Sequence, residues 1–425
     1  MSKTSVFSNF YKLNPNERLR FVKEFADLSD EEVALLQNTG SLPLDLADRM
    51  IENVVGAFPL PLGIAVNFLI NKHDYLIPMA IEEPSVVAAA SYAAKMVREG
   101  GGFYTSSTPP VMIGQIQVVN VKDPYAAKMR VIQAKEEILK KANEQDPVLV
   151  SAGGGARDVN ARVISTSQGS MLIVELDVDC RDVMGANAVN TMLEATAPIV
   201  ERLTGGHVYL RIISNLAVKR LARAWCIVPK EAVGGEEVVN GIVSAYAFAA
   251  ADPYRAATHN KGILNGIIAV ILATCNDHRA IEAGAHAYAV KNGHYTSLST
   301  WEKNENGDLA GSIELPMAVG LVGGAVKTHP IAKIAVKILG VKTANELGEV
   351  SAAVGLAQNL GALRALASEG IQRGHMSLHA RNIAVAAGAT GELIDLVAAK
   401  MVEERKIRMD RAKELIEQHK KPAKT

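Results

Sequence analysis

The order of strand-like and helix-like segments between residues 111 and 214 constrains the fold more than any other feature of the sequence. A strand pattern at 111–121 precedes a helix pattern at 123–145, and two strands, a helix and a last strand follow at 158–165, 170–180, 186–206 and 207–214. In SMLIVELDVDC, apolar residues alternate with acidic ones, which is typical of a strand with one face in water. The order β-α-β-β-α-β is that of a ferredoxin-like sandwich, so we expect an independently folding insert.

The rest of the chain predicts a larger, helix-rich unit. Its 425 residues exceed what one core usually supports. Pro15 and a capping box that begins at Ser29 predict two small helices near the N-terminus. The stretch EEPSVVAAASYAAKMVREGGG predicts a helix that starts at Pro84 and is buried because it is apolar nearly all round. From Leu216 onward, Ala-rich helices alternate with Gly-rich turns.

We therefore predict an α+β protein with three units. A charged helical tail follows Gly374, and Gly370 and Gly374 are placed where a hinge is permitted. The predicted units are a large domain at 1–109 and 215–373, a small inserted domain at 110–214 and a C-terminal helical domain at 374–425.

Composition excludes several classes of partner. Lys plus Arg equals Asp plus Glu, 45 against 45, so no global field attracts nucleic acid or an anionic membrane. The three cysteines are far apart and lack CxxC spacing, which argues against disulfides and thiolate metal sites and favours a reducing cytosol. The N-terminus lacks a secretory core, and no run of about 18 uncharged apolar residues exists. We expect a soluble, cytoplasmic protein.

A turn at 182–187 is the one anion site that the pattern indicates. Neither GxGxxG after a strand nor GxxxxGK[ST] occurs, so a Rossmann fold and a P-loop are not supported. The turn DVMGAN lies between a strand and a helix N-terminus, where backbone N–H groups and the helix dipole favour a pyrophosphate. An ordinary strand-to-helix turn explains the same residues.

Four ionisable residues stand in apolar or small-residue surroundings, where burial and neighbouring charge shift pKa values: Glu83, Lys261, Asp277 and His375. A carboxylate, an ammonium and an imidazole suit acid/base chemistry, but spacing does not show that they converge. Glu83 as a helix cap, Lys261 with Asp277 as a structural ion pair, and His375 as an interior histidine remain open.

Eight motifs follow one another along nearly the whole chain: MIENVVGAFPLPLGIAVNF, EEPSVVAAAS, GGGARD, RDVMGANAVNTM, AYAFAAADPYRAATHNKGI, GAHAYA, GLVGGAVKTHP and GLAQNLGALRALASEGIQRGHMSLHARN. In these motifs, their order and their spacing, the chain resembles class II 3-hydroxy-3-methylglutaryl-coenzyme A reductases. The resemblance implies a soluble oxidoreductase that interconverts the coenzyme A thioester and mevalonate in two hydride transfers. The large domain would bind coenzyme A and substrate, the small one NAD(P), and the C-terminal one would be a flap.

The resemblance also implies a role for each motif residue. Glu83 would donate a proton to the aldehyde-level intermediate, and Lys261, in a dry pocket, would stabilise the oxyanion. Asp277 would hold both in their working protonation states, and His375 would protonate the departing thiolate. The residues expected around the substrate are Ser85, Asn215, Arg255, Asn265 and Gln358.

For the cofactor, the resemblance implies phosphates at the 182–187 turn, with Asp182, Met184, Gly185, Ala186 and Asn187 as contacts. Asp146 resembles an acidic residue that binds the ribose 2′-hydroxyl and repels the extra phosphate of NADPH, so NAD(H) is favoured and NADP(H) is possible. The family's sites form between two subunits, which implies a homodimer and possibly a higher oligomer. No metal is expected, because His375 and His379 have no third ligand at suitable spacing.

Two other classes of function share some of these features. A coenzyme A transferase or lyase would recognise the same ligand without a nicotinamide. A binding or assembly protein would not require Glu83, Lys261, Asp277 and His375 together. The direction of the reaction, towards synthesis or degradation of mevalonate, is not encoded in these residues.

Overall fold

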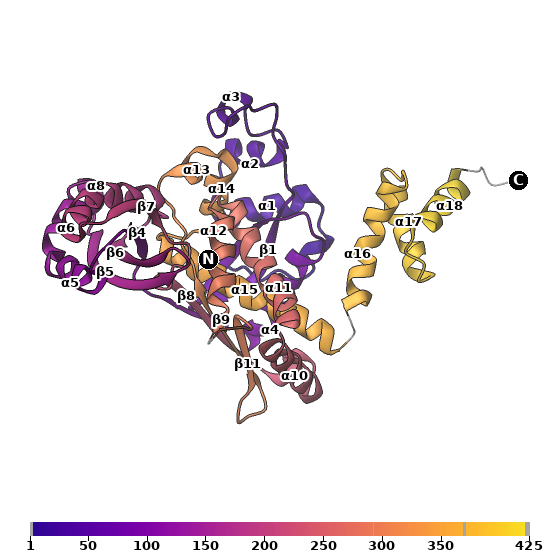
Figure 1. Ribbon diagram of the computed structural model, residues 1–425. Coiled ribbons are helices and arrows are strands. Elements are labelled where there is room, and N and C mark those ends of the chain that lie inside the picture. The colour runs from indigo at the N-terminus through magenta and orange to yellow at the C-terminus, as the bar shows by residue number, and fades with distance from the viewer. Residues whose placement is uncertain (1–2, 292, 369–370, 421–425) are drawn as a thin grey trace, which may run out of the picture.

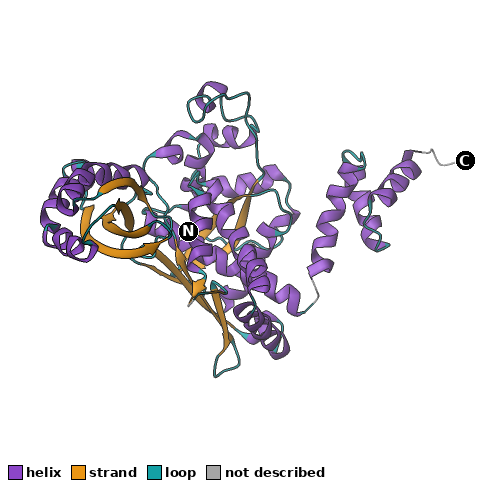
Figure 2. Ribbon diagram, in the orientation of Figure 1, coloured by secondary structure: helices purple, strands orange, loops and turns teal. Residues whose placement is uncertain are grey.

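The computed structural model describes residues 3–291, 293–368 and 371–420. Figures 1 and 2 show a helix-rich body with a smaller lobe of strands and helices on one side and three C-terminal helices on the other. The mixture of helices and sheets agrees with the predicted α+β class.

The smaller lobe contains an antiparallel sheet with the strand order β5-β6-β4-β7. Its elements are β4 (Val111–Val119), α5 (Pro124–Gln133), α6 (Lys135–Asn143), α7 (Pro147–Ser151), β5 (Gly155–Thr166), β6 (Gly169–Asp179), α8 (Ala186–Thr204) and β7 (His207–Ile213). The predicted order of strands and helices is present. The helix pattern at 123–145, however, forms two helices that meet at Ala134, where ψ is 16°.

The body contains strands that the sequence analysis missed. The hairpin β1 (Leu62–Ile70) and β2 (His73–Ala80) precedes a sheet of order β11-β12-β8-β3, formed by β3 (Tyr104–Ser107), β8 (Leu221–Val228), β11 (Ser299–Lys303) and β12 (Leu309–Pro316). In β8, buried Ala222, Ala224, Cys226 and Val228 alternate with more exposed residues. Small residues on the buried face gave this strand the composition of an Ala-rich helix. Two short strands, β9 (Val290–Lys291) and β10 (His294–Tyr295), form a separate pair.

Two long helices pack at the centre of the body. These are α11 (Pro253–Ala273) and α15 (Ala344–Ala367). A Cβ on Gly266 of α11 would lie 2.8 Å from the Cβ of Gln358 on α15, so glycine permits their close approach. The other helices after β8 are α9 (Lys230–Val233), α10 (Glu236–Ala251), α12 (His278–Tyr288), α13 (Gly324–Thr328) and α14 (Pro330–Leu339).

Helix α4 (Val86–Glu99) differs from its prediction in two respects. It begins at Val86 rather than Pro84, after Ser85 with a left-handed φ of 76°. It is also only half buried: Ala90 and Ala94 lie in the core, but Tyr92 and Lys95 are exposed. The side that the sequence suggested was covered is one wall of a large groove.

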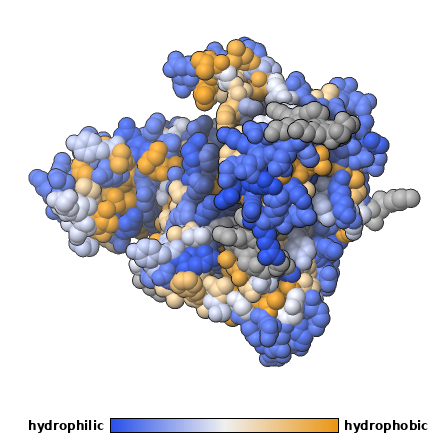
Figure 3. Space-filling model, turned by 90° about the vertical axis from the view of Figure 1, so that its right-hand side faces the viewer, coloured by the Kyte–Doolittle hydropathy of each residue, from blue (hydrophilic) through white to orange (hydrophobic). Residues whose placement is uncertain are grey.

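The N-terminal segment begins with a 3₁₀ turn (Phe10–Lys12), α1 (Pro15–Ala26), α2 (Asp30–Gln37) and α3 (Leu44–Ala47). The predicted capping box is present, because the Ser29 N–H donates to Glu32 Oε2 at 2.8 Å and Ser29 Oγ accepts from the Glu32 N–H at 3.2 Å. Around α3 the apolar side chains of Leu44, Ile51, Val55 and Phe58 are exposed. Figure 3 shows hydrophobic surface at the top of the molecule, where α3 lies.

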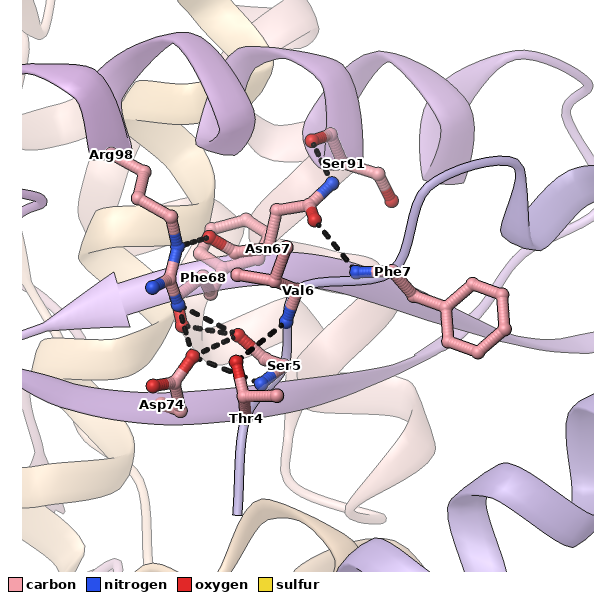
Figure 4. A network of polar contacts seen from close by, with 9 residues as sticks. All are labelled: Thr4, Ser5, Val6, Phe7, Asn67, Phe68, Asp74, Ser91 and Arg98. Atoms are coloured by element: carbon pink, nitrogen blue, oxygen red, sulfur yellow. Dashed lines mark hydrogen bonds and ion pairs between the residues drawn. The ribbon is translucent and has the colours of Figure 1, made fainter. Parts of the chain in front are cut away.

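Residues 4–7 are fastened to the body by a polar network (Figure 4). Ser5 donates its N–H to Asp74 Oδ1 at 2.9 Å and its hydroxyl to the Phe68 carbonyl at 2.9 Å. Arg98, at the end of α4, forms an ion pair with Asp74 and donates to Ser5 Oγ at 3.1 Å. The start of the chain, β2 and α4 therefore share one network.

The C-terminal helices α16 (Ile371–Ala386), α17 (Glu392–Glu403) and α18 (Met409–Lys420) have their own apolar cluster. Gly374 lies within α16, so the helix begins before the predicted domain boundary, and Gly370 lies outside the described residues. Within 3–291, 293–368 and 371–420, no helix has both the length and the apolarity needed to cross a bilayer.

Candidate active site

Two of the predicted catalytic residues meet although they lie 178 positions apart. Lys261 Nζ of α11 donates to Glu83 Oε2 at 2.8 Å, and Asn265 Nδ2, one turn along, lies 3.4 Å from the same oxygen. Glu83 belongs to the loop between β2 and α4. An exposed ion pair contributes only about 0–1 kcal/mol to stability, so stability alone does not account for this arrangement.

Glu83 and Lys261 line a cavity of about 230 Å³. One wall is a stripe of α11, since its lining residues recur at helical spacing. The complete lining is Ala80, Ile81, Glu82, Glu83, Lys261, Leu264, Asn265, Ile268, Ala269, Leu272, Glu282 and His286. A small, partly open cavity with both apolar and charged lining residues suits a short acyl chain that bears polar substituents.

The expectation of a dry pocket for Lys261 is wrong for the single chain. The Lys261 side chain is 60% exposed and that of Glu83 is 35% exposed. The α11 face is formed, but the cavity is open on the side of the ammonium group. The ammonium group of Lys261 must be shielded from water before it can stabilise an oxyanion as strongly as in a water-excluded site.

A buried polar cluster fixes α11 just before Lys261. His259 is 2% exposed, and its Nε2 lies 2.8 Å from Ser299 Oγ and 2.9 Å from Ser297 Oγ. Ser299 donates its hydroxyl to Asn359 Oδ1 and Ser297 donates its own to the Ser299 carbonyl. Asn359 Nδ2 also lies 3.2 Å from Nε2, so this nitrogen has three polar partners. Burial, and secondarily the charge of Arg255, lowers the pKa of His259 to about 4, so the imidazole is neutral.

Asp277 does not join Glu83 and Lys261 in the described part of this chain. It caps α12, accepting from the N–H groups of Arg279 and Ala280 at 3.1 and 3.2 Å, and pairs with the Arg279 side chain at 3.2 Å. The alternative of a structural ion pair between Lys261 and Asp277 is wrong, because Lys261 pairs with Glu83.

The other predicted substrate residues do not line the cavity. Gln358 is 6% exposed, and its Oε1 has no hydrogen-bond partner among the described residues. Arg255 lies on α11, but neither it nor the exposed Asn215 lines the cavity. Ser85 is the left-handed residue before α4, and such strain in a non-glycine residue often marks a functional site. His375 falls in α16, and its side chain is outside what the structure describes.

Three ionisable residues of the cavity were missed by the sequence analysis: Glu82, Glu282 and His286. Glu282 and His286 are four residues apart on α12, so they lie on one face of that helix. This spacing was a readable signal, and His286 belongs to the GAHAYA motif. Neither residue stood out, because the sequence did not show that α12 borders α11.

A groove of about 1520 Å³ runs along the exposed side of α4. Val87, Ser91 and Lys95, spaced by four, form one wall, and the N-terminal segment forms another. The cationic side chains of Arg18, Lys95, Arg98 and Arg381 line it, against one lining carboxylate, Glu99. Arg98 and Arg381 also pair with carboxylates outside the lining, Asp74 and Asp395. The groove thus combines an apolar surface with positive charge, and its wall starts four residues after Glu83.

The predicted cofactor turn has the features of an anion site. Gly185 is the N-cap of α8 with φ 110°, and no described side chain caps this helix. A Cβ on Gly185 would lie 2.5 Å from the buried Cys180 Sγ, so only glycine fits. Asp182 is already engaged, because it accepts from the Ala344 N–H at 2.7 Å. The α8 N-terminus fits a pyrophosphate.

Asp146 caps the short helix α7 through a hydrogen bond from the Leu149 N–H at 2.9 Å. This uses Oδ1 and leaves Oδ2 as a further acceptor. Beyond the other end of α7, Arg157 and Arg181 both donate to the Gly153 carbonyl, and both lie 3.4 Å from Asp179 Oδ2. No group of three or more His, Cys, Asp or Glu side chains in the described ranges could hold a metal ion.

Comparisons with known proteins agree on one family. The model of hydroxymethylglutaryl-coenzyme A reductase matches residues 14–380. The 3-hydroxy-3-methylglutaryl-coenzyme A reductase of Archaeoglobus fulgidus is 64% identical over 414 residues, covering 97% of this chain and 94% of that protein. A probable reductase of Borreliella burgdorferi is 34% identical, covering 88% of each chain.

Solved structures give the same result. The 3-hydroxy-3-methylglutaryl-coenzyme A reductase of Streptococcus pneumoniae superposes with a TM-score of 0.84 at 40% identity, covering 98% of this chain and all of that one. A structure of the class II enzyme from the same organism, bound to NADPH in open conformations, has a TM-score of 0.83 at 42% identity and covers 85% of this chain and all of that one. Fold and site thus define an oxidoreductase of mixed helices and sheets. The chain belongs to the hydroxymethylglutaryl-coenzyme A reductase family, and its function is that of a reductase.

Proposed function

We propose that the chain interconverts 3-hydroxy-3-methylglutaryl-coenzyme A with mevalonate and coenzyme A, reversibly, in two steps and with four electrons. The observation that carries this proposal is the pairing of Glu83 with Lys261 at 2.8 Å in an acyl-sized cavity. When bound, the nicotinamide cofactor supplies a hydride in each step. The chain's own residues bind the acyl group, stabilise negative charge on its oxygen and move protons.

Each catalytic residue has a distinct task in this proposal. Lys261 stabilises the oxyanion that forms as the carbonyl is reduced, and Asn265 helps to hold Glu83. Glu83 is then positioned to donate a proton to the aldehyde-level oxygen. His375 protonates the departing thiolate. Within one chain Asp277 caps α12. It can therefore act on Glu83 and Lys261 only if its carboxylate is brought to them from another position.

The three units have separate roles. Residues 1–109 and 215–373 bind coenzyme A and the acyl group, 110–214 bind the cofactor, and 374–425 form a flap. Coenzyme A lies in the groove along α4, whose cationic residues suit its phosphates and whose apolar wall suits its pantetheine arm. Lys95→Glu should raise KM for the thioester and leave KM for free mevaldehyde unchanged, because mevaldehyde lacks coenzyme A.

The cofactor lies at the N-terminus of α8, with Asp182, Met184, Gly185, Ala186 and Asn187 around its phosphates. NAD(H) is favoured, because the free oxygen of Asp146 suits a ribose hydroxyl and repels a phosphate. Arg157 and Arg181, which donate to the Gly153 carbonyl just after α7, are the cations that we expect to let NADP(H) be used as well.

The active unit is a homodimer. Two observations support this: Lys261 is more than half exposed in one chain, and the apolar side chains around α3 lack cover, with Val55 98% and Phe58 90% exposed. Burying such a patch against a second copy is favourable. It would also exclude water from the site if the two surfaces adjoin.

An absorbance assay tests the proposed reaction. The protein should oxidise NADH or NADPH with the thioester, and reduce the oxidised cofactor with mevalonate and coenzyme A. Lys261→Ala should lower kcat at least about a hundredfold in both steps, since it removes the oxyanion contact. Lys303→Ala is the matched control, because Lys303 forms a similar ion pair with Glu236, at 2.6 Å, outside the cavity. Equal activity of the two variants would refute the role of Lys261.

A further inference from the structure

His286 of α12 lines the same cavity as Lys261 of α11 and Glu83 of the loop after β2. Its Nδ1 lies 2.8 Å from the hydroxyl oxygen of Tyr295. That same oxygen accepts a hydrogen bond from Asn260 Nδ2 at 3.0 Å. Tyr295 has one proton to give, so with Asn260 as donor it gives that proton to His286 Nδ1.

This chain of contacts fixes the tautomer of His286. A neutral imidazole that accepts at Nδ1 carries its proton on Nε2. Tyr295 cannot rotate freely, because Asn260 is fully buried and also bonds the loop after Tyr295, through the Thr296 carbonyl at 2.9 Å and the Leu298 N–H at 2.9 Å. His286 is thus presented to the cavity with a defined N–H donor.

The anchor of this arrangement lies next to the catalytic lysine. Asn260 and Lys261 are consecutive on α11, where Asn260 orients Tyr295 and Lys261 contacts Glu83. Both sides of the cavity are therefore set by one turn of helix. His286 is exposed and lines the cavity, and Tyr295 occupies only its Nδ1, so Nε2 is accessible to a ligand there.

The charges of the cavity indicate which substrate group His286 meets. Three carboxylates, Glu82, Glu83 and Glu282, line it against a single lysine. Such surroundings disfavour the free carboxylate of the acyl chain. A hydroxyl, in contrast, needs both a donor for its oxygen and an acceptor for its proton. His286 and Glu282, one turn apart on α12, supply these two functions.

We propose that His286 and Glu282 bind the tertiary hydroxyl of the acyl group, and that Tyr295 is a positioning residue that orients His286. This inference rests on the proposed function and adds to it the residues that select a 3-hydroxylated acyl chain. His286 donates Nε2–H to the hydroxyl oxygen, and Glu282 accepts the hydroxyl proton. The apolar residues of the cavity, such as Leu264 and Ile268, take the methyl group beside it.

Two substitutions of His286 separate the roles of its nitrogens. The amide nitrogen of Gln reaches the place of imidazole Nε2, whereas the amide of Asn reaches only that of Nδ1. His286→Gln should therefore keep KM for 3-hydroxy-3-methylglutaryl-coenzyme A near the wild-type value. His286→Asn should raise this KM about tenfold with little change in kcat. This is expected when one hydrogen bond is lost that binds the substrate and the transition state equally well. Tyr295→Phe should raise KM in the same direction.

The specific readout is a substrate without the hydroxyl. For 3-methylglutaryl-coenzyme A, wild type and His286→Asn should have the same KM, because the lost contact does not exist there. His294→Asn is the control, since His294 follows the same helix but does not line the cavity. An equal rise of KM for both thioesters, or none for either, would overturn the proposal. Absence of any cofactor oxidation by wild type would instead refute the proposed function.

Discussion

Replacing His259 by Gln should remove a pH-dependent part of the stability. The pKa of this imidazole is lowered to about 4 from 6.5, chiefly by burial. Its Nδ1 is buried without a hydrogen-bond partner among the described residues, so a proton there would have no acceptor. The unfolded chain therefore binds more protons than the folded one between these two pKa values. Stability is fully present above pH 6.5 and is lost as the pH falls towards 4.

The size of the effect follows from the two pKa values. Between pH 7 and pH 4.5, protonation of His259 in the unfolded chain should cost the folded state roughly 2.5 kcal/mol. The amide of His259→Gln keeps a donor near the position of Nε2 and does not titrate. The variant should therefore not show this additional loss of stability at low pH, whatever its stability at pH 7. Carboxylate titrations are common to both proteins and cancel in the difference.

Denaturant unfolding at pH 7 and pH 4.5, at one protein concentration, measures this difference. Wild type should lose roughly 2.5 kcal/mol more than His259→Gln over the interval. His294→Gln, at an exposed position, should behave like wild type. Parallel pH profiles for wild type and His259→Gln would refute the reasoning, because they would show that the buried ring does not resist protonation.

Three further results are expected. His375→Ala should impair reduction of the thioester while sparing that of free mevaldehyde, which has no thiolate to protonate; equal losses in steady-state assays with both substrates would contradict the assigned role. Asp146→Ala should lower kcat/KM for NADH relative to kcat/KM for NADPH about tenfold, which corresponds to the loss of one hydrogen bond to a charged group. An unchanged ratio would show that Asp146 does not select the cofactor. Gly185→Val should raise KM for both cofactors at least about tenfold, because its Cβ would meet Cys180 Sγ at 2.5 Å in a left-handed conformation, and normal cofactor titrations would disprove the anion site.

Local patterns predicted the elements that depend on local physics. The strand and helix order of residues 111–214 was readable from the alternation of apolar and polar residues, and the capping box at Ser29 is a contact between near neighbours. The expectation that the acidic face of 170–180 lies in water was wrong, because Asp177 and Asp179 of β6 are buried and pair with Lys219 and with two arginines. Strand β8 was missed because its buried residues are small enough to resemble a packed helix. Burial of α4 was overestimated because a groove wall and a core face have similar composition.

The candidate site depended on contacts that spacing does not encode. Glu83 and Lys261 were identified by family resemblance, and their meeting is a property of how α11 packs beside the loop after β2. His286 escaped notice because its significance comes from Tyr295 and Asn260, which reach it from two other segments. Asp277 was grouped with the pair, but in one chain its carboxylate is occupied in capping a helix.

The fastening of residues 4–7 to the end of α4 bears on how the protein is handled. A helix of 14 residues spans about 20 Å, and this one begins beside Glu83 and ends at the ion pair between Arg98 and Asp74. Removal of the first seven residues would take away the contacts of Ser5 with Asp74 and Arg98 at the far end of this helix. A purification tag at the N-terminus should therefore be joined through a linker that leaves Ser5 in its network.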